Sequence, residues 1–195
     1  MIIASNNKNK ILQLKEILPS YNLKSLNECG INVEVEETGK TFEENSTIKA
    51  KAIFDLTHDS VIADDSGLCI LEYNNWPGVE THRFLGENST HIERNDFILN
   101  KMKNLDYNKR KCVSVCVITL IDKKGNVYSF KGELYGHIAK ESKGNNSFGY
   151  DDIFELDNGV VMAELTNEEK YKFSARAKAL ELLQNFIALH KEIEL

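Results

Sequence analysis

Short apolar segments alternate with amphipathic ones along the first part of this chain. Residues 1–4 are apolar enough for a short buried strand, and from Ile11 to Leu18 apolar residues recur at helical spacing until Pro19. The polar residues 5–10 between them are expected to form a loop. The order strand, polar loop, helix places backbone N–H groups where α/β folds bind anions, at the carboxyl end of a strand.

The next segments predict two strands and a helix. Residues 31–36 alternate as a strand does, and residues 37–39 form a turn. Thr41 is positioned to cap a helix that runs to about Thr57. Residues 61–63 are a second short buried strand. We expect the polar residues 64–67 to end it, with extended chain over 68–71.

The second half predicts a hairpin and two helical regions. Residues 89–103 have a helical pattern, and residues 111–121 and 127–134 form strands joined by a turn at 124–126. A loop follows at 144–147, and an amphipathic helix begins at about Asn167 or Ser174 and ends near His190. The sum predicts an α/β fold with a mixed sheet, flanking helices and an antiparallel portion.

Composition narrows the class of protein. The chain has 195 residues, of which 42% are hydrophobic and 28% charged, which suits a single domain over residues 1–195 with its own core. A net charge of −6 disfavours binding to a nucleic-acid polymer, although a local basic pocket is compatible with it. If the substrate carries phosphates, a divalent metal is expected to mediate their binding to this acidic chain.

The location is expected to be cytoplasmic. No apolar run approaches the roughly 20 residues that cross a bilayer, so no membrane is expected as a partner, and the N-terminus is not a secretory signal. The cysteines form no Cys-x-x-Cys pair and should be reduced and mostly buried: Cys29, Cys69, Cys112 and Cys116.

The polar run after the first strand is a candidate phosphate-binding segment. It offers backbone donors, amides and two ammonium groups at a helix start, from Ser5, Asn6, Asn7, Lys8, Asn9 and Lys10. The run has no Gly and lacks the spacing of a P-loop. The alternative is a solvated turn with a helix cap.

Adjacent carboxylates at the end of the second strand are a candidate metal site. Asp64 and Asp65 repel each other, and such pairs are often kept because a cation or a proton lies between them. Glu37 could join them, and hard oxygen ligands favour Mg²⁺ over zinc. An ordinary acidic turn is the alternative. Lys49 lies about two turns into the following helix and could equally be a surface lysine.

Two further segments are candidate ligand contacts. In the segment Phe148, Gly149, Tyr150 and Asp151, an aromatic ring could stack on a planar base and the carboxylate could accept from ring N–H groups. A core aromatic is the alternative. Lys170 and Arg176 add two cations near the C-terminal helix, where surface cations are also common.

Taken together and in order, these motifs resemble the inosine/xanthosine triphosphate pyrophosphatase family, the house-cleaning enzymes of the Ham1 type. The resemblance covers nearly the whole chain. It rests on Ser5, Asn7 and Lys10, on E-T-G-K-T-F-E-E-N at 37–45 with Lys49 and Ala50, on A-D-D-S-G-L at 63–68, on P-G-V at 77–79 with Arg83, on F-G-Y-D at 148–151, on A-E-L-T-N-E-E-K at 163–170 and on S-A-R-A-K-A-L at 174–180.

This resemblance implies an ITPase-like (Maf/Ham1-type) fold, with two lobes around a central cleft, and a homodimer. It implies hydrolysis of ITP, dITP and XTP to the monophosphate and pyrophosphate with Mg²⁺. Asp65 would be the general base and a metal ligand, Glu37 another ligand, and Asp64 would support them. The residues implied to bind the purine nucleoside triphosphate are the 5–10 segment, Lys49, Ser66, the 148–151 segment, Lys170 and Arg176.

The chain departs from the family at positions that bear on the base. The family usually has His where Ala175 stands, Pro where Asp152 stands, and glycines where Asn145, Asn146 and Ser147 stand. In the family that His, with the following Arg, recognises the 6-keto oxygen of the base. Other hypotheses are therefore an altered or broadened base specificity, a Maf-type pyrophosphatase, or a nucleotide-binding module that has lost turnover.

Overall fold

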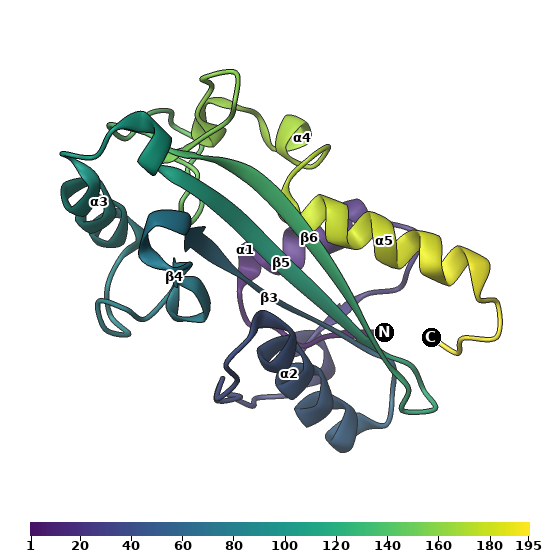
Figure 1. Ribbon diagram of the computed structural model, residues 1–195. Coiled ribbons are helices and arrows are strands. Elements are labelled where there is room, and N and C mark those ends of the chain that lie inside the picture. The colour runs from purple at the N-terminus through teal and green to yellow at the C-terminus, as the bar shows by residue number, and fades with distance from the viewer. The chain divides into compact units, whose positions relative to one another are not determined.

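The computed structural model describes residues 1–195 and combines helices with one mixed sheet (Figure 1). The strands are β1 (Ile2–Ile3), β2 (Lys24–Ser25), β3 (Val61–Ile70), β4 (Trp76–Pro77), β5 (Lys111–Ile121), β6 (Val127–Ile138) and β7 (Phe154–Glu155). The helices are α1 (Lys8–Ile17), α2 (Phe42–Thr57), α3 (His91–Met102), α4 (Asn167–Lys170) and α5 (Ala175–Leu189). None of these helices is long and apolar enough to cross a membrane.

The sheet has the strand order β2-β1-β3-β5-β6-β7, with β4 paired to β3. It is parallel through β2, β1 and β3, and antiparallel where β4 meets β3 and where β7 meets β6. The predicted α/β fold with a mixed sheet and flanking helices is therefore confirmed.

The chain divides into two compact units, each built from separate stretches. The first unit consists of Met1–Asp65, Cys116–Gly132 and Arg176–Leu195. The second consists of Ser66–Val115 and Glu133–Ala175. Strands β3, β5 and β6 each run from one unit into the other, so a residue's unit depends on where along the strand it lies.

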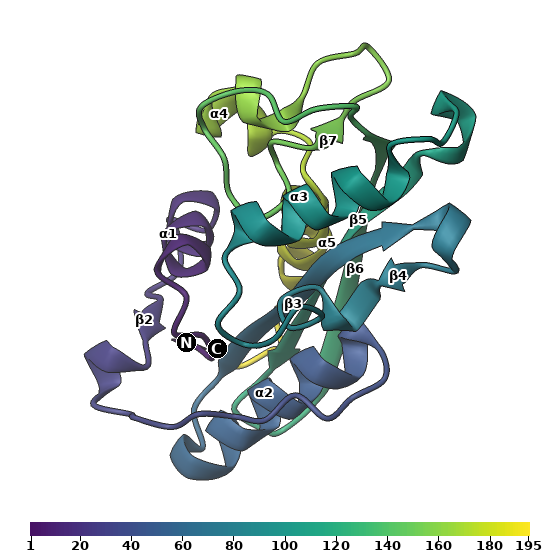
Figure 2. The same ribbon diagram turned by 90° about the vertical axis from the view of Figure 1, so that its left-hand side faces the viewer.

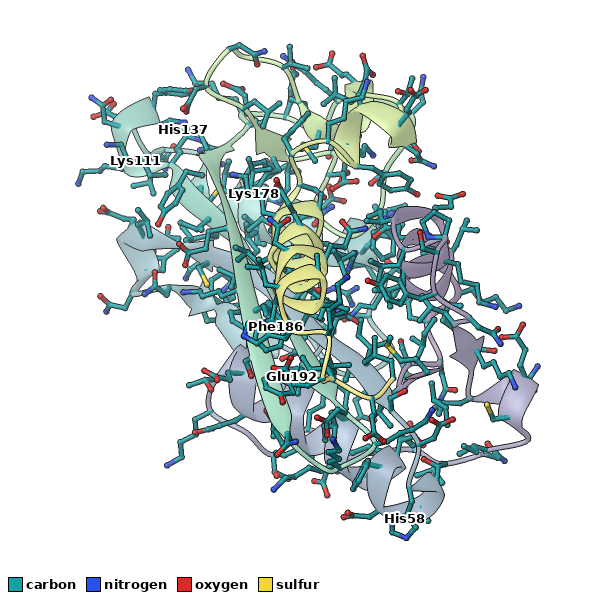
Figure 3. The ribbon with its side chains drawn as sticks, turned by 90° about the vertical axis from the view of Figure 1, so that its right-hand side faces the viewer. His58, Lys111, His137, Lys178, Phe186 and Glu192 are labelled. Atoms are coloured by element: carbon teal, nitrogen blue, oxygen red, sulfur yellow. The ribbon has the colours of Figure 1, made fainter.

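The core of the first unit lies between its parallel strands and α2. Ala50 and Ile53 of α2 are fully buried against Val61 and Ala63 of β3 and Ile2 of β1. Helix α5 lies on the opposite face of these strands from α2 (Figures 2 and 3). The predicted helices that became α2 and α5 therefore cover the two faces of these strands.

Aromatic side chains hold α5 to strand β6 of the first unit. The ring of Phe186, labelled on α5 in Figure 3, lies 4.8 Å from the ring of Tyr128 and 5.2 Å from that of Phe130. Tyr128 and Phe130 are two residues apart on the strand and therefore share a face. This contact fixes helix α5, which carries the site residue Arg176 in its first turn.

The core of the second unit lies around α3. Ile98 and Met102 of this helix are fully buried with Ile70 of β3 and Ile138 of β6. Arg110 is also buried, and its guanidinium donates to the carbonyls of Met102, Ile138 and Ala139. It thereby satisfies a helix-end carbonyl that has no partner within α3. All four cysteines are free, and Cys69, Cys112 and Cys116 are buried, as predicted.

Three predicted elements are wrong. Residues 31–36 are not a strand: Ile31 and Val33 pack on the core of the first unit, but this stretch pairs with no strand. Residues 5–10 are not all loop, because α1 begins at Lys8. Residues 64–67 do not end the second strand, since β3 continues unbroken from Val61 to Ile70. The two aspartates therefore lie within a strand and not in a turn.

Candidate active site

Strand β3 places Asp64 and Asp65 side by side in the chain and buries both, with 2% and 3% of each residue exposed. Successive side chains on a strand point to opposite faces of the sheet. The two carboxylates consequently have different partners, all within the first unit. We call the group of Lys10, Glu37, Lys49, Asp64, Asp65 and Arg176 the charged cluster.

Asp64 is paired with two cations from two helices. Its Oδ2 accepts from Arg176 Nη2 at 2.8 Å and lies 3.0 Å from Lys10 Nζ. Burial alone would raise the pKa of Asp64, but Lys10 and Arg176 outweigh it and hold that pKa well below the usual range. Asp64 is therefore ionised whenever the protein is folded at neutral pH.

Lys49 bridges the other two carboxylates of the charged cluster. From helix α2 its Nζ lies 2.6 Å from Glu37 Oε1 and 3.3 Å from Asp65 Oδ1. Burial opposes the charge on Lys49, but Asp65, Asp64 and Glu37 together raise its pKa above the ordinary value. Lys49 is thus a cation placed among carboxylates and not a surface lysine.

The pKa of Asp65 is shifted in the opposite direction from that of Asp64. Burial raises the pKa of Asp65 above its usual value, and the negative charge of Glu37 adds to this while Lys49 opposes it. A carboxylate held in this way has a greater affinity for a proton than an exposed aspartate. This property suits a group that must take a proton from water.

Two oxygen atoms of the charged cluster are buried and have no hydrogen-bond partner, Asp64 Oδ1 and Asp65 Oδ2. Leaving a buried acceptor unpaired is costly, so such atoms call for an explanation. No group of three His, Cys, Asp or Glu side chains converges as a complete metal site. Mg²⁺, however, is usually bound by one or two carboxylates together with substrate phosphates, and this donor set fits that pattern.

The turn before α2 explains why Glu37 reaches this cluster. Thr41 caps the helix by accepting from Glu44 N at 3.1 Å, and Asn45 Oδ1 accepts from Gly39 N at 2.7 Å. A Cβ atom on Gly39 would lie 2.6 Å from Asn45 Oδ1, so only glycine fits there. The hydrogen bonds within the E-T-G-x-T-F-x-E-N segment therefore fold the turn back onto α2 and fix the position of Glu37.

The predicted phosphate-binding segment becomes the start of α1. Asn7 is the helix cap, and its side chain accepts from the backbone N–H groups of Asn9 and Lys10. Ser5 Oγ accepts from Asn7 N at 3.2 Å. Asn6, Asn7, Lys8 and Asn9 are exposed, whereas Lys10 turns inward to Asp64. The segment thus divides into an exposed helix start and one buried cation.

In the second unit, the segment Phe148–Asp151 forms a turn fixed by its polar neighbours. Lys170 Nζ donates to Asp151 Oδ2 at 2.8 Å and to the carbonyl of Asn146. The Tyr150 hydroxyl donates to the carbonyl of Thr81, and burial raises the pKa of Tyr150 to about 12. Phe148 and Gly149 are half-buried. Tyr150 therefore anchors the turn to Thr81, while the ring of Phe148 is partly accessible.

The predicted site residues thus fall into separate groups. Lys170 pairs with Asp151, whereas Arg176 pairs with Asp64 and also donates to Gln13 of α1. Ser66 follows Asp65 on β3 and is half-buried. Gln13 was not predicted, because a glutamine on a helix carries no motif.

A second residue that sequence reasoning missed is Asn95 of α3. It is fully buried, and its amide donates to Gly149 O at 2.9 Å. Its position among the apolar residues of the helix was the one available signal, since a buried amide needs polar partners.

Comparison with known proteins shows relatives over nearly the whole chain. The model of the Ham1 family matches residues 1–186. The chain is 40% identical over 190 residues to the dITP/XTP pyrophosphatase of Thermoanaerobacter sp. (strain X514), covering 96% of each chain. It is 41% identical over 193 residues to the dITP/XTP pyrophosphatase of Clostridium perfringens (strain 13 / Type A), covering 94% of this chain and 95% of the relative.

A solved structure gives the same result for the fold. The Staphylococcus aureus Ham1 protein superposes with a TM-score of 0.87 at 39% identity, covering 96% of this chain and 97% of that one. A match of this extent in sequence and in fold leaves one assignment: the chain belongs to the Ham1 family.

Proposed function

We propose that this protein is a nucleoside triphosphate pyrophosphatase that hydrolyses deaminated purine nucleotides, ITP, dITP and XTP, to the monophosphate and pyrophosphate. The observation that carries the proposal is the charged cluster, in which Asp65 and two further carboxylates lie among three cations. The relatives named dITP/XTP pyrophosphatase supply the substrate class.

The proposed chemistry is attack of water on the α-phosphorus. The bond between that phosphorus and the oxygen bridging to the β-phosphate breaks, and pyrophosphate leaves. Asp65 takes the proton of the attacking water, and its raised pKa and burial suit this general-base role. Lys10, Lys49 and the N-terminal end of α1 would hold the phosphates.

Glu37 and Asp65 are the residues that would hold Mg²⁺, with Asp64 supporting them. The unpartnered oxygens Asp64 Oδ1 and Asp65 Oδ2 support this assignment. When bound, the ion would neutralise charge on the phosphate oxygens. In the same proposal Lys49 exchanges its carboxylate partners for phosphate oxygens as the substrate binds.

The test is pyrophosphate release from ITP, XTP, dITP, GTP and ATP, with Mg²⁺ and with a chelator. We expect metal-dependent release from ITP and XTP that Asp65→Asn abolishes. Asp55→Asn, an exposed aspartate on α2, is the matched control and should retain activity. Tight binding of nucleotide without release would instead favour a binding module that has lost turnover.

A second candidate, the same reaction with broadened base specificity, is favoured by Ala175. A donor aimed at the 6-keto oxygen meets an amino group in adenine, and leaving a donor unpaired costs about 1–3 kcal/mol, or about 5- to 150-fold. Ala175 supplies no such donor. We therefore expect the ratio of ITP to ATP turnover to be lower in the wild type than in Ala175→His.

The fold of this variant must be checked, because Ala175 is only 3% exposed and a larger side chain has to displace its neighbours. An unchanged thermal midpoint makes the comparison valid. If the wild type excludes ATP as well as Ala175→His does, the specificity is not broadened at this position.

A further inference from the structure

Asp152 collects hydrogen bonds from three side chains of the second unit. Its Oδ1 accepts from Asn95 Nδ2 at 2.5 Å and from Ser147 Oγ at 3.1 Å, and its Oδ2 accepts from Ser142 Oγ at 3.0 Å. Its carbonyl also accepts from Lys143 N at 2.9 Å. One residue thus ties both sides of the loop 142–147 to helix α3.

Asn95 extends this link to the turn that carries the predicted base contacts. The same Nδ2 that donates to Asp152 also donates to Gly149 O, and the residue is completely buried. Within the turn, Asp151 N donates to Phe148 O at 3.3 Å. A shift of Asn95 or of Asp152 would therefore move the turn between Phe148 and Asp151.

A different set of contacts holds the other side of the turn. Lys170 reaches Asp151 and the carbonyl of Asn146, and Asn146 Nδ2 donates to Leu165 O at 2.9 Å. Lys170 and Asp151 are predicted to meet the substrate, so they cannot anchor the turn independently of it. Asp152, Asn95, Ser142 and Ser147 are free to do so, because none is assigned to the nucleotide.

We propose that Asp152, acting through Asn95, Ser142 and Ser147, is a positioning residue that fixes Phe148 and Asp151 for the base of the nucleotide. This inference rests on the proposed function. A carboxylate accepts only and has about four lone-pair sites, which suits three donors. Alanine removes all three bonds, whereas asparagine retains an acceptor and can donate to the Ser142 hydroxyl.

The phosphates are assigned to the charged cluster, and the side-chain partners of Asp152 are Asn95, Ser142 and Ser147, which are not part of it. Loss of positioning should therefore weaken binding of the nucleotide without slowing the chemical step. Such a loss raises KM and leaves kcat unchanged. A merely structural role would instead lower the amount of folded enzyme and leave KM as it was.

The experiment combines kinetics with hydrogen exchange. Pyrophosphate release from ITP is measured for the wild type, Asp152→Ala, Asp152→Asn and Ser147→Ala, with Asp96→Ala, an exposed neighbour of Asn95 on α3, as control. We expect KM to rise about tenfold in Asp152→Ala with kcat within about twofold, and rescue to within about threefold in Asp152→Asn. Amide exchange of residues 142–153 should accelerate in Asp152→Ala and not in Asp96→Ala.

An unchanged KM in Asp152→Ala would overturn the positioning role, whether or not amide exchange in the loop is faster. If Asp152→Ala does not fold, Ser147→Ala decides: it removes one bond at an exposed residue and should still raise KM severalfold. If the wild type hydrolyses no triphosphate, the proposed function fails. The positioning role is then judged by calorimetric binding of ITP, which it predicts to be weaker in Asp152→Ala, and absence of binding to the wild type overturns it as well.

Discussion

The ammonium nitrogen of Lys49 lies 3.3 Å from Asp65 Oδ1, so a helix residue and a strand residue form one partly buried charge pair. The same nitrogen is 2.6 Å from Glu37 Oε1. Lys49 therefore has the partners that a bound cation would need. In the proposed site the lysine and the metal compete for carboxylates until phosphate oxygens give the lysine other acceptors.

Replacing this lysine should strengthen metal binding in the absence of nucleotide. Lys49→Met keeps an unbranched side chain, one atom shorter, and removes the charge, so we expect Mg²⁺ affinity to rise at least about fivefold, corresponding to about 1 kcal/mol. Turnover should fall, because a proposed phosphate contact is lost. Calorimetric titration with MgCl₂ measures the first effect, with the exposed Lys51→Met as control. Equal or weaker Mg²⁺ binding would contradict the competition.

Arg176 should contribute to stability as well as to the site. Its guanidinium and Lys10 neutralise Asp64, whose side chain is completely buried. Removing one partner of a buried pair costs about 3–5 kcal/mol, and because Lys10 remains we expect about 3 kcal/mol for Arg176→Ala. Urea unfolding measures the loss, and the exposed Lys191→Ala should show almost none. A loss below about 1 kcal/mol would mean that Lys10 alone satisfies Asp64.

The parts of the fold that the sequence predicts well are those with local signals. Helix α2 has its cap in Thr41 and its end at Thr57, and β5 spans the whole predicted strand at 111–121. The segment 31–36 has equally good alternation but no strand beside it. Alternation reports which side chains are buried, whereas pairing depends on a distant part of the chain.

In the site, too, the sequence identifies individual residues from local motifs but not the contacts between distant ones. The motifs identified Glu37, Lys49 and Asp65 as residues of interest, and the structure brings these three together. The motifs could not say that Lys49 bridges the two carboxylates. Nor could they pair Arg176 with Asp64, 112 residues away in sequence, because no local pattern links residues at that separation.

Gly39 is expected to be indispensable for placing Glu37. A Cβ atom there would meet Asn45 Oδ1 at 2.6 Å and Glu44 Cβ at 2.7 Å, which forces the turn away from α2 and breaks the Gly39 N to Asn45 bond. We expect Gly39→Ala to reduce kcat/KM for ITP by about tenfold or more, the cost of about 1.4 kcal/mol in transition-state stabilisation. Lys40→Ala, an exposed side chain in the same turn, should retain activity. Wild-type kinetics in Gly39→Ala would show that Glu37 does not depend on this turn.

Glu28 should make stability depend on pH in acid. A hydrogen bond from Lys15, followed by the backbone N–H and hydroxyl of Ser25, lowers the pKa of Glu28 from 4.5 to about 2. Because the folded-state pKa is depressed, the stabilising contribution is present above the unfolded-state value of 4.5 and disappears as the pH falls towards 2.

The test of this contribution is Glu28→Gln, which removes the charge and keeps the shape. The difference in unfolding free energy between wild type and Glu28→Gln should be constant above about pH 4.5 and shrink steadily below it. Urea unfolding at a series of pH values measures this difference. Glu16→Gln, at an exposed position on α1, should show no such trend. A difference that stays the same down to pH 3 would mean that the contribution of Glu28 comes from its hydrogen bonds and not from its charge.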